Sequence, residues 1–97
     1  MSKTKLQVVA RAHRVIGVLA ADENPTADMQ EFAGATLEAA LDELGYTQGV
    51  GVTFDSTLVP DAVFVPLADL VASEIAAHYG VQGPSRARAL TRIRAYL

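Results

Sequence analysis

Apolar residues recur at spacings of three and four along this chain, and that period constrains its fold more than any other feature. The period is clearest between Thr26 and Gly45, where the apolar positions fall on one side of a helix with 3.6 residues per turn. These positions are Met29, Phe32, Ala33, Leu37, Ala40, Leu41 and Leu44. Thr26 is a candidate N-cap, and Asp28 suits the positive end of the helix dipole. We therefore expect a long amphipathic helix that ends near Gly45.

Residues 4–16 show the same period and predict a first helix, with Gly17 as its stop. One side of this helix is apolar and another is polar or basic. The apolar side carries Leu6, Val9, Ile16 and either Ala12 or His13, and the other side carries Lys3, Gln7, Arg11 and Arg14. His13 can equally belong to the basic side, so its environment stays open at this point.

Two more helices are predicted in the second half of the chain. One runs from about Pro66, a residue favoured in a first turn, to Tyr79, with Gly80 as its stop. It is nearly all apolar, which predicts a central position. The other follows Ser85, and its apolar stripe lies among arginines. That stripe consists of Leu90, Ile93 and Leu97.

Residues 45–62 lose the helical period. Glycines loosen the backbone, and Val50, Val52 and Phe54 alternate as in a short strand. We expect a projecting loop or short β-hairpin between the second and third helices. The predicted fold class is therefore mainly α, a small four-helix bundle with one core and one domain over residues 1–97.

Lysines and arginines all lie near the two ends of the chain. They are Lys3, Lys5, Arg11, Arg14, Arg86, Arg88, Arg92 and Arg94, whereas all eleven acids lie between Asp22 and Glu74. If the two ends lie together, the surface divides into regions of opposite sign, which suits head-to-tail association or a charged partner. The alternative is that the basic helices pair with the acidic ones inside each monomer.

Residue chemistry predicts neither an enzyme nor a cofactor. The chain has no cysteine, and its two histidines, His13 and His78, lack the spacing of a metal pair. Asp55 and Ser56 before a helix are reminiscent of an acyl carrier protein, but Thr57 and Pro60 depart from that pattern. The absence of cysteine favours a reducing cytoplasm, and no secretory or membrane-spanning segment is predicted.

Three stretches together resemble the head-to-tail adaptor family of tailed phages, which includes the tail accessory factors that stabilise packaged DNA. They are VVARAHRVIGVLA, NPTADMQEFAGATLEAALDELG and VPLADLVASEIAAHYGV, in the family's order and over about half of the chain. The resemblance implies a structural subunit of the virion, made in the host cytoplasm, which forms a ring on the portal protein. That ring is expected to match the twelvefold portal, to hold the next tail component and to let DNA pass. No membrane partner is expected.

The resemblance also directs attention to particular residues. The fourth helix is a candidate for docking on the portal in place of the longer carboxyl-terminal arm of the tail accessory factors. Candidate portal or subunit contacts are Arg86, Arg88, Arg92, Arg94, Leu97, Lys5, Arg11 and Arg14, and candidate loop contacts are Val50, Val52, Phe54 and Asp55. The alternative function is a small DNA-associated regulator or another protein-interaction module that uses the basic helix, since arginines can bind phosphates.

Overall fold

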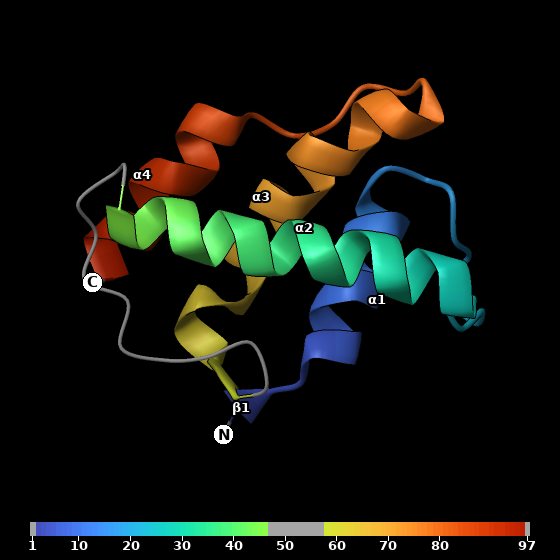
Figure 1. Cartoon of the computed structure of the whole chain (residues 1–97), viewed down its shortest axis with the longest axis horizontal. Coiled ribbons are helices and arrows are strands. Elements are labelled where there is room, and N and C mark those ends of the chain that lie inside the picture. The colour runs from blue at the N-terminus through green and yellow to red at the C-terminus, as the bar shows by residue number, and fades with distance from the viewer. Residues whose placement is uncertain (1, 47–57, 97) are drawn as a thin grey trace.

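The computed structural model describes residues 2–46 and 58–96 and, within them, four helices and two very short strands. In chain order these are β1 (Ser2–Lys3), α1 (Lys5–Val15), α2 (Ala27–Tyr46), β2 (Val59–Pro60), α3 (Asp61–Tyr79) and α4 (Arg86–Tyr96) (Figure 1). The prediction of a mainly α fold with four helices is confirmed.

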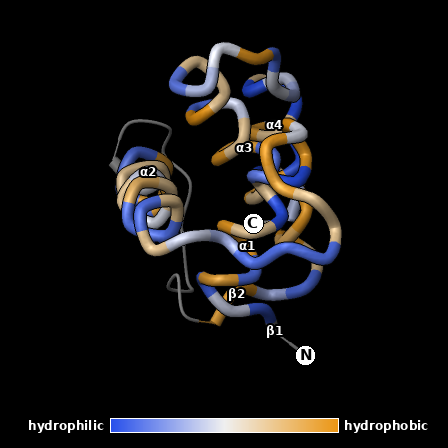
Figure 2. Tube along the Cα trace, turned by 90° about the vertical axis from the view of Figure 1, so that its right-hand side faces the viewer, coloured by the Kyte–Doolittle hydropathy of each residue, from blue (hydrophilic) through white to orange (hydrophobic). Residues whose placement is uncertain are grey.

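Helix α3 is the centre of the fold. It packs against α1, α2 and α4, and α1 and α4 lie on either side of it while α2 crosses in front (Figures 1 and 2). Nine of its residues are buried: Val63, Pro66, Leu67, Ala68, Leu70, Val71, Ala72, Ile75 and Ala76. Together with the buried faces of the other three helices, they form one hydrophobic cluster. This burial explains why the α3 sequence shows almost no polar side.

The helix ends follow the predicted signals closely. The Thr26 hydroxyl accepts a hydrogen bond from the Met29 N–H at 3.2 Å, as expected for an N-cap. Gly17 and Gly80 both have positive φ, at 80° and 67°, where residues with a Cβ are strained. The polypeptide therefore leaves α1 and α3 at the positions that the glycines indicate.

The predicted start of the third helix was wrong. Helix α3 begins at Asp61, with Pro60 as its N-cap, so Pro66 is the sixth helical residue. Pro66 removes one backbone hydrogen bond and crowds the preceding turn, which costs about 3 kcal/mol in a helix interior. The added turn buries Val63 completely and the Pro66 ring within the core. Apolar burial of about 1.5–3 kcal/mol for a side chain such as valine offsets the cost.

The loop or short hairpin expected within residues 45–62 lies mostly outside the described residues, which resume at Leu58. Strand β2 pairs in antiparallel fashion with β1, so its partner is the amino-terminal segment and not a neighbour in the same loop. Ser2 lies opposite Pro60, and Lys3 lies opposite Val59. This pairing fixes the start of α1 beside the start of α3.

Candidate functional site

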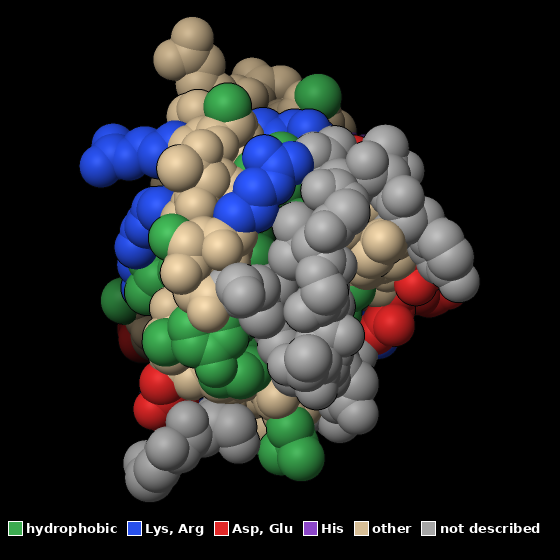
Figure 3. Space-filling model, turned by 90° about the vertical axis from the view of Figure 1, so that its left-hand side faces the viewer, with side chains coloured by type: hydrophobic (Ala, Val, Ile, Leu, Met, Phe, Trp, Pro, Cys, Tyr) green, Lys and Arg blue, Asp and Glu red, His purple; other side chains and the backbone are tan. Residues whose placement is uncertain are grey.

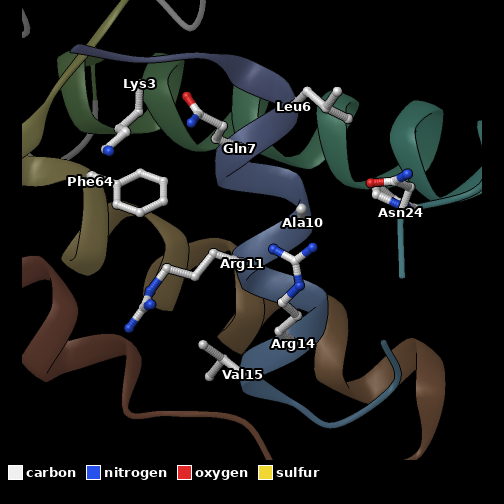
Figure 4. Close-up of a pocket in the computed structure, with 10 residues that line it drawn as sticks. Lys3, Leu6, Gln7, Ala10, Arg11, Arg14, Val15, Asn24 and Phe64 are labelled. Atoms are coloured by element: carbon white, nitrogen blue, oxygen red, sulfur yellow. The ribbon is translucent and has the colours of Figure 1, made fainter. Parts of the chain in front are cut away.

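The outer face of α1 forms the largest hollow among those described on the surface. It encloses about 560 Å³ and lies between the start of α3 and the loop that joins α1 to α2 (Figure 4). Its lining residues are Lys3, Leu6, Gln7, Ala10, Arg11, Arg14, Val15, Asn24, Pro25 and Phe64. We call this hollow the α1 groove.

The α1 groove combines positive charge with apolar surface. Lys3, Arg11 and Arg14 are the charged residues that line it among those that the structure describes, and no acid is in that set. Leu6 and Val15 remain 49% and 40% exposed, which corrects the expectation that Leu6 belongs to the buried side of the helix. A surface with exposed apolar side chains among cations suits a protein partner that carries acids beside small or apolar residues.

Phe64 holds two of the cations at one side of the groove. The Lys3 Nζ lies 5.6 Å from the centroid of the Phe64 ring, and the Arg11 Cζ lies 5.9 Å from it. Both distances allow a cation–π attraction. The Arg11 Nε is shielded from solvent and has no hydrogen-bond partner among the described residues. Neither cation is neutralised by a carboxylate in an ion pair that the structure describes.

Arg14 shapes the opposite side of the groove by holding the loop after α1. Its Nη2 donates to the Glu23 carbonyl at 2.9 Å, and its Nε lies 3.4 Å from the Ala20 carbonyl. The Glu23 carboxylate in turn accepts a hydrogen bond from the Ala20 N–H at 2.9 Å. Arg14 thus positions the wall that contains Pro25 while its charge stays at the surface.

Three of the other basic candidates form ion pairs within the monomer. Lys5 pairs with Glu38 of α2 at 3.3 Å, and Arg92 pairs with Asp69 of α3 at 3.5 Å. For these two residues and for Arg86, the alternative of internal pairing between basic and acidic helices is confirmed.

Arg86 joins three helices. It starts α4 and binds the carboxylates of Glu74 on α3, at 2.6 Å, and Glu43 on α2. Hydrogen bonds to Glu74 and then Glu43 raise the pKa of the Arg86 guanidinium. Its first role is therefore to connect elements of the fold.

Arg88 and Arg94 lie exposed on α4. Arg94 has an interaction partner, whereas the Arg88 side chain has none among the described residues, and the Arg88 backbone N–H donates to the Ser85 hydroxyl. On the face in Figure 3, Lys and Arg side chains gather in the upper and left parts, and acids lie at the right margin and lower left. Leu97 and the loop candidates Val50, Val52, Phe54 and Asp55 lie outside the described residues.

The outward face of α2 is acidic. Asp28, Glu31, Glu38 and Asp42 are all exposed, and they recur at spacings of three, seven and four. Asp28, Glu31 and Asp42 have no partner within the parts of the chain that the structure describes. We call this surface the α2 acidic stripe. It shares no residue with the α1 groove.

His13 occupies a position that the sequence left open. It is fully buried, with Nδ1 at 2.8 Å from the Val9 carbonyl and Nε2 at 3.0 Å from the Tyr79 hydroxyl. His78 instead stacks on Phe32, with ring centroids 4.3 Å apart. Over residues 2–46 and 58–96, no three residues of metal-binding type gather in one place. The two histidines therefore act in packing in this structure.

Helix α3 is long and apolar enough to cross a membrane by length and composition alone, with a mean hydropathy of 1.3. Half of the residues in that window are buried against the rest of the fold. A central helix of a globular domain has the same composition, so this feature does not identify a membrane span.

Comparisons of the chain with protein-family models, with curated proteins and with solved structures give no match.

Proposed function

We propose that this chain is a structural adaptor subunit of a phage-like particle, which forms a ring on the portal and joins the capsid to the tail. The observation that carries the proposal is the division of the surface charge that has no ion-pair partner among the described residues. Lys3 and Arg11 lie in the α1 groove, whereas Asp28, Glu31 and Asp42 lie on α2. A small subunit with opposite charges on separate faces can bind one neighbour through each face, as a ring requires.

The proposed portal contact is the exposed side of α4. Arg88 and Arg94 are exposed on this helix, and Tyr96 at its carboxyl end is 46% exposed. Tyrosine and arginine are enriched at the centres of protein interfaces. Arg86 and Arg92 contribute less to this contact, because carboxylates of α2 and α3 already bind them.

The alternative of a DNA-associated regulator has less support. It depends on several arginines of α4 being available for phosphates, and two of the four form ion pairs within the monomer. The net charge of −3 also opposes association with a polyanion.

Sedimentation with purified portal protein from the same genome tests the proposal. We expect the chain to sediment with the portal at a saturating ratio and Arg88→Glu to weaken this binding at least about tenfold, as loss of an interface arginine does. Arg88→Lys is the matched control, because it keeps the charge. Failure of the folded wild-type chain to sediment with the portal would refute the adaptor function. If Arg88→Glu binds the portal as tightly as the wild-type chain does, Arg88 on α4 is not part of the portal contact.

A further inference from the structure

We infer that the occupant of the α1 groove is a second copy of this chain, which inserts its α2 acidic stripe. This inference rests on the proposed function and names the two surfaces that meet between neighbouring subunits. The outward residues of α2 in question are Asp28, Glu31, Ala35, Glu38 and Asp42. Their alternating spacing of three and four residues places them along one side of the helix, as in a helix that packs along a groove.

Charge complementarity is the first argument. The groove presents Lys3, Arg11 and Arg14, with no acid among the described residues that line it. The stripe presents Asp28, Glu31 and Asp42, and no Lys or Arg occurs anywhere in residues 15–85. Opposite potentials on two surfaces favour the docked arrangement and speed encounter.

The shapes of the two surfaces also agree. Ala10, only 6% exposed, lies within the lining of the groove, and small residues on α2 separate the acids of the stripe. Ala35 and Ala39 are exposed, so another backbone can approach α2 closely there. Leu6 to Arg14 spans roughly 12 Å along α1, and Asp28 to Asp42 spans roughly 21 Å along α2. The stripe is thus longer than the part of the groove that α1 forms.

The two surfaces cannot satisfy each other within one molecule. No residue of α2 lines the α1 groove, and the cation of α1 that reaches α2 is Lys5, which pairs with Glu38 outside the groove. Contact between a groove and a stripe is therefore heterologous. In any pair of subunits, one groove and one stripe stay unoccupied. Repetition of this contact produces a closed ring or an open filament.

A nucleic acid is the less favoured occupant. Three cations form the charged part of the groove, and the whole chain has a pI of about 5.2. A phosphate backbone gives exposed apolar side chains such as Leu6 and Val15 no apolar surface to pack against. Contact with the alanines of α2 would remove their apolar surface from water, which is favourable.

The absence of cysteine makes directed cross-linking unambiguous. We would place one cysteine in the groove, Leu6→Cys, and one on the stripe, Ala35→Cys, in separate chains. A short bismaleimide is then added to the mixed chains, both free in solution and after binding to the portal. Gln82→Cys, which is exposed in the loop between α3 and α4, replaces Ala35→Cys in the matched control.

We expect the mixture of Leu6→Cys and Ala35→Cys to form a cross-linked heterodimer at least about tenfold faster than the mixture with Gln82→Cys. Arg11→Glu in the groove chain should abolish this excess. Glu31→Arg in the stripe chain should restore it, because the two charges are exchanged. Circular dichroism of each variant establishes that it is folded.

Each outcome decides between the possibilities. A ring on the portal without the Leu6–Ala35 cross-link would refute the groove contact and leave the adaptor function standing. Absence of both the ring and any cross-link in solution would refute both. Retention of a labelled oligonucleotide by the wild-type chain, lost in Arg11→Glu, together with no cross-link, would assign the groove to nucleic acid and overturn the inference.

Discussion

Replacing Tyr79 by phenylalanine removes one hydroxyl and keeps the ring, which isolates the hydrogen bond to His13. A backbone carbonyl can only accept, so in a neutral His13 the Nδ1 donates to the Val9 carbonyl, at 2.8 Å. The Nε2 must then accept from the Tyr79 hydroxyl at 3.0 Å. The ring contact between His13 and Tyr79, with centroids 5.5 Å apart, survives the substitution.

The expected loss of stability follows from the burial of His13, which is 0% exposed. Tyr79→Phe leaves the Nε2 acceptor without a partner and away from water, and an unsatisfied buried polar group costs about 1–3 kcal/mol. For a domain of this size, about 2 kcal/mol corresponds to a fall in Tm of roughly 8–16 °C. Urea denaturation followed by far-ultraviolet circular dichroism measures the change in the free energy of unfolding.

A second substitution tests the physical reason for that loss. His13→Leu removes the ring nitrogens and fills the site with an apolar side chain, so no acceptor needs the Tyr79 hydroxyl. In the His13→Leu background, Tyr79→Phe should cost less than about 0.5 kcal/mol, which gives a coupling energy of about 1–2 kcal/mol. Equal costs of Tyr79→Phe in the two backgrounds would refute the proposed interaction.

Three further substitutions test other parts of the fold. Gly83→Ala should destabilise by about 1–3 kcal/mol in thermal denaturation, since the added Cβ would lie 2.9 Å from the Ala76 Cβ; an unchanged Tm would show that the loop moves freely. Thr4→Ala removes the capping box of α1 and should cost about 1 kcal/mol by urea titration, whereas Thr4→Ser should cost little. Arg86→Met should cost about 0.5–1 kcal/mol, discounted because the side chain is 41% exposed. The pKa of Arg86 is raised in the folded state, so its contribution to stability is complete below the unfolded pKa and is lost only as pH rises through the folded pKa. The loss of unfolding free energy caused by Arg86→Met should therefore stay constant from about pH 7 to about pH 10. A decline of this loss within that window would contradict the ion pairs assigned to Arg86.

Local patterns in the sequence predicted the helices well. The apolar stripe of α2, its Thr26 cap and the glycines that end α1 and α3 are all local signals, and the structure contains each of them. The start of α3 was missed because a proline usually begins a helix or stops one. The gain from burying Val63 and the Pro66 ring depends on the other helices, and no local pattern shows it.

Contacts between distant parts of the chain were less predictable. Pairing of β1 with β2 joins the amino terminus to residues 59–60, and the partner of His13 lies 66 residues away at Tyr79. The polar side of α1 was predicted, and Arg11 and Arg14 do line the groove. Its wall at Phe64 comes from α3, so the hollow itself could not be read from the spacing of residues in α1.

Imaging of the portal after addition of this chain tests the central claim most directly. Purified portal from the same genome is mixed with saturating protein, and negative-stain electron microscopy scores class averages for density beneath the portal. The account predicts a continuous added ring with the wild-type chain and a broken or missing ring with Arg11→Glu. Bare portals in the presence of folded wild-type protein would contradict it.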